Sequence, residues 1–348
     1  MARAVELARQ GFPAPNPRVG CVIVREGVIV GEGFHAFAGG PHAEVSALEA
    51  AGELARGADV YVTLEPCNHY GRTGPCSEAL IRAGVSTVTY AVPDPSQQAR
   101  GGGERLRQAG IKVIEGVLSS AAEAVNQVFL RAVRHQRSFV TLKAATTLDG
   151  KIANDKGESK WITGPEAREQ GHRLRAEMGA VLLGANTVRT DDPQLTARIE
   201  GVRNQPVRLV LDPHRSLADS YQIFREPGET IRVVSEANAH TGDIAVQILS
   251  NENIDLSDLL RKTYERGING LLVEGGSLTL GAFLSAGLFD RLELFIAPKI
   301  MGAGLPWAGL SLENLSEMIP IEILGVQRLG SDLWISAEPK RSSQIESV

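Results

Sequence analysis

The chain has 348 residues, of which 43% are hydrophobic and 22% charged, and its formal net charge is −5. This length favours about two domains, and the acidic balance without a long basic stripe argues against a nucleic-acid partner. No apolar run approaches the roughly 18 residues that span a bilayer, and the start of the chain lacks a secretory pattern, so no membrane association is predicted. Three cysteines are too few for a disulfide scaffold, and we therefore expect a reduced, cytoplasmic protein.

The first third of the chain alternates strand-like and helix-like segments. Strands are predicted at residues 19–24, 28–33, 59–64, 85–92 and 111–114. Helices are predicted at residues 43–55, 77–83, 101–109 and 119–135. This alternation predicts a sheet with helices packed on its faces.

A new strand-like run begins at residue 139, so we place a domain boundary near residue 138, giving domains 1–138 and 139–348. Strands of the second domain are predicted at residues 139–144, 180–183, 207–211, 231–234, 270–273 and 292–296. Helical patterns at residues 165–175, 256–266 and 277–286 separate several of them. The second domain is therefore also predicted to be α/β.

The most informative motif is His42-Ala43-Glu44, followed by Pro66-Cys67 and then Cys76. This order is typical of zinc-dependent base deaminases, in which the glutamate moves protons and does not bind the metal. The match is incomplete, because eight residues separate the two cysteines where that pattern has two. Zinc held by three protein ligands keeps a position for water, whose pKa it lowers towards about 7. We predict His42, Cys67 and Cys76 as zinc ligands and Glu44 as the general acid/base.

Two other interpretations remain open from the residues alone. A closed structural zinc site would take His69 or His35 as a fourth ligand. Alternatively, the two cysteines are unconnected loop residues and His42 is a helix cap. Cys21 lies inside an apolar strand and is predicted to be a core residue.

In the second domain, the segment Glu274-Gly275-Gly276-Ser277 lies between a predicted strand and a predicted helix. Backbone N–H groups at a helix start attract anions, and glycine allows close approach, so this loop could cradle phosphates. It is not a G-x-G-x-x-G motif, so a Rossmann fold has no support. An ordinary tight turn explains the pattern equally well.

Several motifs in fixed order resemble the bifunctional deaminase/reductase family of riboflavin biosynthesis. In the first domain they are segments 15–20, 40–44 and 63–76, including Thr63-Leu64-Glu65-Pro66-Cys67 and Gly74-Pro75-Cys76. In the second domain they are segments 147–151, 157–163, 187–193, 273–276 and 297–299. The gap of eight residues between the cysteines suits this family better than the cytidine or tRNA-adenosine deaminases. The resemblance covers nearly the whole chain.

The resemblance implies a cytidine-deaminase-like α/β/α sandwich that deaminates a diaminopyrimidinone bearing a phosphoribosylamino group. His42, Cys67 and Cys76 would bind one zinc ion, and Glu44 would be catalytic. Asn16, His35 and Arg72 would contact the substrate. After Asp94-Pro95 this chain has Ser96–Gly103 where the family usually continues with Asn-Pro and a more regular glycine loop, so substrate contacts around Asp94 are not carried over.

For the second domain the resemblance implies a dihydrofolate-reductase-like α/β fold that uses NADPH to reduce the ribosyl group to ribityl. The implied NADPH contacts are Ala145, Trp161, Thr187, Asp191, Pro213, Gly276, Ser277, Leu278, Thr279, Leu280, Gly281 and Ala282. The implied substrate contacts are Ser159, Arg175, Leu195, Arg198 and Glu274. Lys151 and Asp191 are the candidates for the proton donor, and the family also implies a homo-oligomer.

Overall fold

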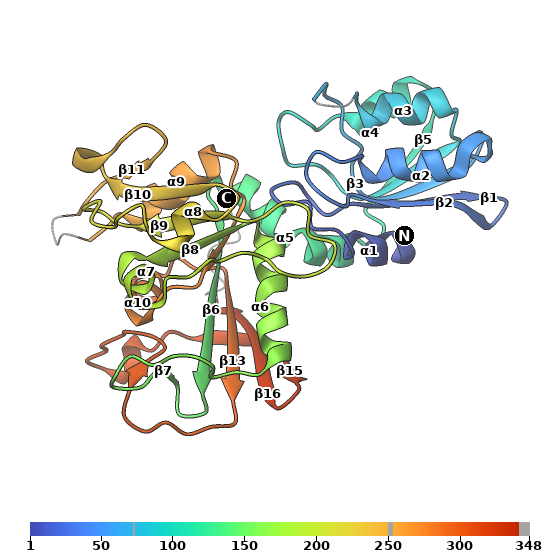
Figure 1. Ribbon diagram of the computed structural model, residues 1–348. Coiled ribbons are helices and arrows are strands. Elements are labelled where there is room, and N and C mark those ends of the chain that lie inside the picture. Colours follow the sequence, from blue (N-terminus) through green and yellow to red (C-terminus); the bar gives the residue numbers. More distant parts are fainter. Residues whose placement is uncertain (72–73, 250–252, 341–348) are drawn as a thin grey trace. The chain divides into compact units, whose positions relative to one another are not determined.

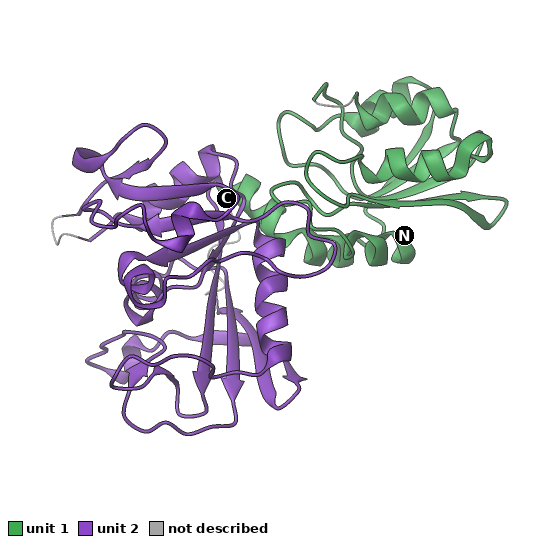
Figure 2. Cartoon of the chain, in the orientation of Figure 1, with its two compact units in different colours: residues 1–135 green, residues 136–348 purple. Residues whose placement is uncertain are grey.

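The structure of the protein is a computed structural model that describes residues 1–71, 74–249 and 253–340 (Figure 1). The chain forms two compact units, Met1–His135 and Gln136–Val348, whereas the predicted boundary lies near residue 138 (Figure 2). No helix in the described ranges combines the length and the apolar character that crossing a membrane requires.

Unit 1 contains a five-stranded sheet in the order β2-β1-β3-β4-β5 (Figure 1). Its strands are β1 (Gly20–Arg25), β2 (Val28–Phe34), β3 (Asp59–Leu64), β4 (Thr87–Val92) and β5 (Lys112–Glu115). Strand β1 is antiparallel to β2 and β3, whereas β3, β4 and β5 are parallel to one another. The carboxyl ends of β3 and β4 therefore lie at one edge of the sheet, where the loops of an α/β fold carry their functional groups.

Helices cover both faces of this sheet, as predicted. They are α1 (Ala2–Ala8), α2 (Ala43–Ala51), α3 (Cys76–Ala83), α4 (Gly102–Gln108) and α5 (Ser119–His135). Helices α2, α3 and α4 lie on one face, with Ala47, Leu80 and Leu106 in a shared core, while α1 and α5 lie on the other (Figure 1). The predicted helix 43–55 divides into α2 and a 3₁₀ turn, Gly52–Ala55, because Gly52 adopts a positive φ of 54°.

Glycines bring α2 into direct contact with β2. A Cβ atom added at Gly33 would lie 2.4 Å from the carbonyl oxygen of Ala43, and one at Gly31 would lie 2.3 Å from that of Ala47. Real Cβ atoms do not approach a carbonyl so closely, so these positions require glycine. The start of α2, where His42 and Glu44 lie, is thereby held against the sheet.

Unit 2 contains a nine-stranded sheet in the order β11-β10-β9-β8-β12-β6-β13-β16-β15, and a small pair, β14-β7. The strands are β6 (Phe139–Thr147), β7 (Lys151–Ala153), β8 (Ala180–Gly184), β9 (Val207–Leu211), β10 (Thr230–Ser235), β11 (Ile244–Val246), β12 (Gly270–Val273), β13 (Arg291–Ala297), β14 (Leu305–Pro306), β15 (Ile321–Leu329) and β16 (Asp332–Pro339). From β11 to β13 the neighbours are parallel, and their apolar runs suit strands buried on both faces.

The helices of unit 2 pack on both faces of the large sheet. They are α6 (Pro165–Met178), α7 (Ala185–Asp191), α8 (Gln222–Arg225), α9 (Leu256–Glu265) and α10 (Ser277–Ser285). Helices α9 and α10 share a core with Val140 and Leu142 of β6. Thr141, which points to the opposite face, donates a hydrogen bond to Met178 at the end of α6.

The β15–β16 hairpin was not predicted from the sequence. All nine residues of β15 are exposed or only half-buried, so the strand has no alternating pattern of buried and exposed residues to reveal it. It is paired on one side only, with the antiparallel strand β16. The hairpin forms one edge of the large sheet.

Candidate functional site

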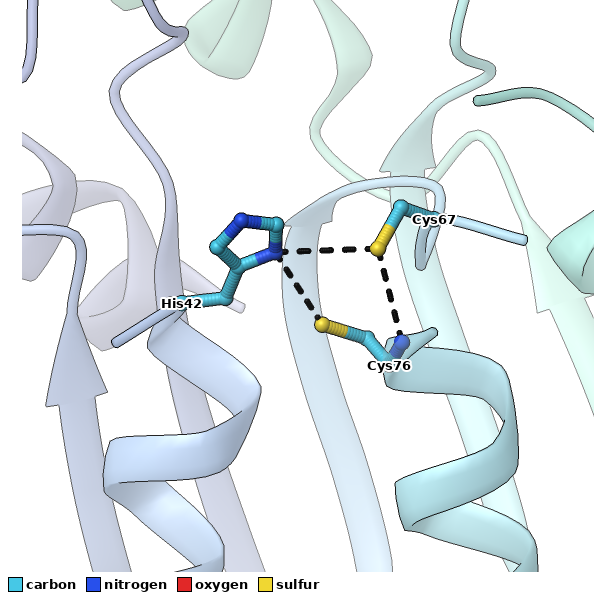
Figure 3. Close-up of side chains that lie close together, drawn as sticks. All are labelled: His42, Cys67 and Cys76. Carbon is cyan, nitrogen blue, oxygen red and sulfur yellow. Dashed lines mark hydrogen bonds between the residues drawn. The ribbon is translucent and has the colours of Figure 1, made fainter. Parts of the chain in front are cut away.

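Three potential metal ligands converge in unit 1 (Figure 3). His42 immediately precedes α2, Cys67 lies in the loop after β3, and Cys76 is the first residue of α3. His42 Nδ1 lies 3.2 Å from Cys76 Sγ and 3.6 Å from Cys67 Sγ. The three candidate ligand atoms all lie within 4.8 Å of one another. One imidazole nitrogen and two sulfurs at such distances form a donor set that fits zinc.

The charges of this cluster favour metal binding. A hydrogen bond from the Cys76 thiol, together with His42 and the backbone N–H of Cys76, lowers the pKa of Cys67. The lowered pKa favours the thiolate of Cys67, the form that binds metals. Hydrogen bonding to Cys67 in turn raises the pKa of His42.

The alternative of a four-ligand structural site finds no support among the residues that the structure describes. The cluster there consists of His42, Cys67 and Cys76, without His69 or His35. His35 is engaged elsewhere, because its Nδ1 lies 2.9 Å from the carbonyl oxygen of Pro41. Three protein ligands are the number found at catalytic zinc sites.

Glu44 lies on the first turn of α2, beside the cluster, and its side chain is buried with 4% of its surface exposed. Burial, followed by the negative charge of Cys67, raises the pKa of Glu44 to about 7. A carboxyl group with a pKa near 7 can both accept and donate a proton at neutral pH.

Asn16 and His35 stand next to the cluster. The ring of His35 lies 5.3 Å from that of His42 in an edge-on arrangement. Asn16 Nδ2 lies 3.1 Å from His35 Nε2, and burial lowers the pKa of His35. A neutral His35 that donates from Nδ1 to Pro41 and accepts at Nε2 from Asn16 satisfies both contacts. Arg72 lies outside the described residues.

A second group of charged residues lies in unit 2, on the side of β6 that faces α6. Arg175 of α6 forms two hydrogen bonds with Glu274, which follows β12: Nε to Oε1 at 2.5 Å and Nη2 to Oε2 at 2.9 Å. Lys143 Nζ of β6 lies 3.6 Å from Oε2 of the same carboxylate. Although burial opposes ionisation, Arg175 and Lys143 lower the pKa of Glu274 to about 2. Burial lowers the pKa of Lys143.

The segment that contains Leu195 and Arg198 adjoins this group. Arg175 Nη1 donates to the carbonyl oxygen of Thr196 at 3.0 Å, and Arg198 Nη1 donates to Thr196 Oγ1 at 2.6 Å. Leu195 adopts a positive φ of 53°, as does Asp192 with 39°. Such backbone conformations are costly for residues other than glycine and often occur at functional sites. The structure thus brings four predicted substrate residues together: Arg175, Leu195, Arg198 and Glu274.

The starts of α7 and α10 also lie against each other. The N–H of Gly276 donates to Thr187 Oγ1 at 3.2 Å. A Cβ atom added at Gly275 would lie 2.4 Å from Thr279, and one at Gly184 would lie 2.9 Å from its hydroxyl oxygen. Glycine at these places lets the first turn of α10 pack closely against the end of β8 and the loop that follows β12. A helix start in such a position suits phosphate.

The remaining predicted cofactor residues have mixed environments. Ser277, Leu280 and Gly281 are buried in α10, whereas Leu278 is 74% exposed. Trp161 is 67% exposed, and the guanidinium of Arg168 lies 4.7 Å from its ring centre. Lys160, which follows Ser159, donates to the carbonyl oxygen of Asp191 at 3.3 Å. Ala145 lies in β6 beside Phe295, Pro213 follows β9, and Ala282 lies in α10.

Known proteins resemble both units. The family model described as "Cytidine and deoxycytidylate deaminase zinc-binding region" matches residues 1–92, and the one described as "RibD C-terminal domain" matches residues 138–335. The riboflavin biosynthesis protein RibD of Aquifex aeolicus is 46% identical over 342 residues, which cover 96% of each chain. The RibD of Escherichia coli K12 is 41% identical, covering 96% of this chain and 97% of that one.

Solved structures agree with these matches. The RibD of Acinetobacter baumannii, form 1, superposes with a TM-score of 0.87 at 39% identity and covers 98% of both chains. The diaminohydroxyphosphoribosylaminopyrimidine deaminase/5-amino-6-(5-phosphoribosylamino)uracil reductase of Thermotoga maritima gives 0.85 at 39% identity, with 97% of both chains covered. The chain belongs to the RibD family.

Membership of the RibD family confirms the predicted fold class and function. The protein is a bifunctional deaminase and reductase of riboflavin biosynthesis. Unit 1 is a cytidine-deaminase-like domain of the zinc-binding type, and unit 2 is the dihydrofolate-reductase-like RibD C-terminal domain. Membership of the family does not test the predicted roles of individual residues. Support for those roles comes from the geometry of this chain.

Lys143 and His172 were not among the residues that the sequence analysis selected. His172 Nδ1 lies 3.0 Å from the carbonyl oxygen of Thr196, the atom that also accepts from Arg175. The sequence contains one clue to Lys143, a charge in the otherwise apolar run 139–144. A lysine inside a buried strand is rare unless it is paired. His172 offers no comparable clue, because it lies in a polar helix.

Proposed function

We propose that unit 1 deaminates 2,5-diamino-6-(5-phosphoribosylamino)pyrimidin-4(3H)-one and that unit 2 reduces the ribosyl group of the product to ribityl with NADPH. The substrates are those named for the Thermotoga relative. The observation that carries the proposal is the buried carboxyl group of Glu44 beside the convergent ligands His42, Cys67 and Cys76. Similar relatives over nearly the whole chain support both steps.

His42, Cys67 and Cys76 would hold the zinc ion. Zinc in such a site supplies a water molecule whose pKa is lowered enough to make it a nucleophile at neutral pH. Cys67 and Cys76 are not joined in a disulfide, which suits both metal binding and the reducing cytoplasm in which we propose the protein works.

Glu44 would carry the protons of the deamination. Water adds its oxygen to the ring carbon, the bond from that carbon to the amino nitrogen breaks, and ammonia leaves. Glu44 accepts a proton from the water and delivers it to the departing nitrogen, and its raised pKa suits both transfers. Asn16 and His35 would hold the pyrimidine at the mouth of this site, and Arg72 is our candidate for its phosphate.

In unit 2, NADPH would supply the hydride for C1′ of the ribosyl group. The hydroxyl of Thr187, which accepts from the N–H of Gly276 and can donate its own proton, would bind the phosphates at the start of α10, with Trp161 as an aromatic surface. Residues Ala145, Asp191, Pro213, Ser277, Leu278, Thr279, Leu280, Gly281 and Ala282 complete the proposed cofactor set. The start of α10 and the hydroxyl of Thr187 are donors of the kind that fits a dinucleotide phosphate.

The charged group in unit 2 would bind the sugar phosphate and supply a proton. Arg198 offers the planar, paired donors that phosphate prefers, while Arg175 would position Glu274 and the segment with Leu195. Ser159 completes the proposed substrate set. When C1′ accepts hydride, its bond to the ring oxygen opens and that oxygen takes a proton. Lys143 now joins Lys151 and Asp191 as a candidate donor, because burial lowers its pKa and its ammonium group faces Glu274.

We further propose that the protein is a homo-oligomer that pairs through β15. Eight large apolar side chains are exposed between residues 312 and 333: Leu312, Leu315, Met318, Ile321, Ile323, Leu324, Val326 and Leu333. A long apolar edge strand without such pairing is prone to aggregate. Glu322 and Arg328 flank Gly325 symmetrically, so antiparallel pairing of two β15 strands about Gly325 would oppose unlike charges.

Charge reversal tests this contact. Glu322→Arg alone and Arg328→Glu alone should each shift the protein towards monomer in sedimentation experiments, and the double variant should restore association. A monomeric parent protein, or single variants that associate as well as the parent, would contradict the pairing.

Separate assays of ammonia release and of NADPH consumption test the two activities. We expect ammonia from the diamino substrate without NADPH, and NADPH oxidation only with the deaminated product. Incubation with tRNA or single-stranded DNA should release no ammonia. Ammonia from either polynucleotide would favour a base-editing enzyme instead.

A further inference from the structure

Glu65 is a buried carboxylate that accepts hydrogen bonds from three backbone N–H groups of another segment. It directly follows β3, lies two residues before Cys67, and has 8% of its surface exposed. Its Oε1 accepts from Gly101 and Gly103, each at 3.0 Å, and its Oε2 accepts from Asp94 at 3.1 Å. Burying a carboxylate costs free energy unless hydrogen-bond donors compensate it. The three N–H groups supply these donors to Glu65.

These donors lie at the two ends of the segment from Asp94 to Gly103. Asp94 comes just after β4, and Gly101 and Gly103 lie at the start of α4. Gly101 precedes α4 and has no side chain to cap it, so Glu65 supplies the cap from a different part of the chain. One side chain thus fixes both ends of the segment.

Close backbone contact reinforces the same attachment. A Cβ atom added at Gly102 would lie 1.7 Å from the carbonyl oxygen of Pro66, the residue between Glu65 and Cys67. The N–H of Asn68 donates to the carbonyl oxygen of Ala99 at 2.9 Å. The segment therefore contacts the chain on both sides of Cys67.

The attachment extends to the second cysteine. The hydroxyl of Ser77, which follows Cys76, donates to Asn68 Oδ1 at 2.9 Å. The N–H of Ser77 donates to the carbonyl oxygen of Cys67 at 3.2 Å. Both sulfur ligands are thus linked through Asn68 to the segment that Glu65 holds.

We propose that Glu65 is a positioning residue for deamination: it fixes the segment 94–103 against the Cys67 loop and so holds the two sulfur ligands and the adjacent wall of the site in their working arrangement. Residues that orient metal ligands without binding the metal commonly contribute 10- to 100-fold to activity. Glu65 is not one of the three candidate ligands, and it acts through the backbone of Asp94, Gly101 and Gly103. This inference rests on the proposed deaminase function of unit 1.

Substitution of Glu65 gives a graded test. Glu65→Gln keeps one acceptor oxygen for Gly101 and Gly103 but turns an amide N–H towards the N–H of Asp94. Glu65→Asp keeps the charge but is one methylene too short to reach the three donors. We expect kcat for ammonia release at saturating substrate to fall about 10-fold in the first and about 100-fold in the second, with one zinc per chain retained and reductase activity unchanged.

Two further variants complete the test. Gly102→Ala perturbs the same attachment from the opposite side and should also lower kcat for ammonia release. Glu104→Gln is the matched control, because Glu104 lies on the same helix with its side chain 63% exposed, and it should leave both activities unchanged.

The outcomes separate the inference from the function on which it rests. If the parent protein releases no ammonia, the proposed deaminase function fails. If the parent is active and the Glu65 variants keep its kcat while only their unfolding temperature falls, Glu65 is merely structural and the inference is wrong.

Discussion

The two units assemble their sites by different means. In unit 1, His42 and Glu44 lie at the start of α2, and Cys67 and Cys76 lie at the two ends of the single loop between β3 and α3. In unit 2, Lys143, Arg175 and Glu274 come from β6, α6 and the end of β12, and they meet only because those elements pack together. Local motifs can be recognised before folding is known, whereas a group of charges that depends on tertiary packing cannot. Because each site is formed within its own unit, we expect a change in one site to leave the activity of the other unchanged.

Metal removal gives the largest expected difference between the units. A chelator that strips zinc should abolish ammonia release, because the three ligands hold the group that activates water. NADPH oxidation by the same sample should continue, since the charged group of unit 2 needs no metal. Ammonia release should return when zinc is added back. Loss of both activities on chelation would contradict the expectation that only unit 1 depends on a metal.

Glu44→Gln tests the proton carrier without removing the metal. The amide cannot accept a proton, so ammonia release should fall by about 10²- to 10⁴-fold. Zinc content, measured on the purified protein, should stay at one per chain, and reductase activity should match that of the parent. If the protein were instead a zinc-stabilised binding protein without catalysis, neither the parent nor Glu44→Gln would release ammonia.

Glu274→Gln is the counterpart in unit 2. It leaves Arg175 and Lys143 buried without an opposing charge, which should cost about 3–5 kcal/mol in the free energy of unfolding of that unit. NADPH oxidation should fall while ammonia release persists. The control is Glu265→Gln on α9, whose side chain is 56% exposed. An unchanged reductase rate in Glu274→Gln would remove Glu274 from the proposed site.

The smallest effect concerns acid stability at Asp149. A hydrogen bond from Thr147 and the N–H groups of Gly302 and Met301 lower the pKa of Asp149 to about 2. Because this pKa is below the unfolded value of about 4, its contribution is complete above pH 4 and is lost as pH falls towards 2. Asp149→Asn should lower the unfolding temperature of unit 2 at pH 7 and reduce the difference from the parent towards pH 2. Asp155→Asn, an exposed control, should do neither.

The sequence predicted most of unit 1 because its information is local. The alternation of strands and helices survives in the structure, and the H-x-E and P-C motifs predicted ligands that the structure brings within 4.8 Å. The end of α2 was misplaced, because the positive φ at Gly52 ends the helix although the apolar pattern of residues 43–55 continues beyond it. The partners of Glu65 could not be predicted, because nearly every residue has a backbone N–H group and the sequence does not indicate which of them a side chain contacts.

Unit 2 was harder to predict for the same reason. Nothing in the spacing of Lys143, Arg175 and Glu274 reveals that they share one site. The hairpin β15–β16 was missed because an exposed strand lacks the alternation that marks a half-buried one. Helix α7, only seven residues long, gave too short a pattern to recognise.

The glycine contact between β2 and α2 has a consequence for naturally occurring variants. A methyl group at position 33 would collide with the main chain of residues 43 and 47 and lift the first turn of the helix. Because that turn carries both an imidazole and a carboxyl group of the site, one conservative replacement would impair metal retention and proton transfer together. A Gly33→Ala allele would therefore present as a riboflavin requirement, although the altered residue lies beneath the helix and touches no reactant.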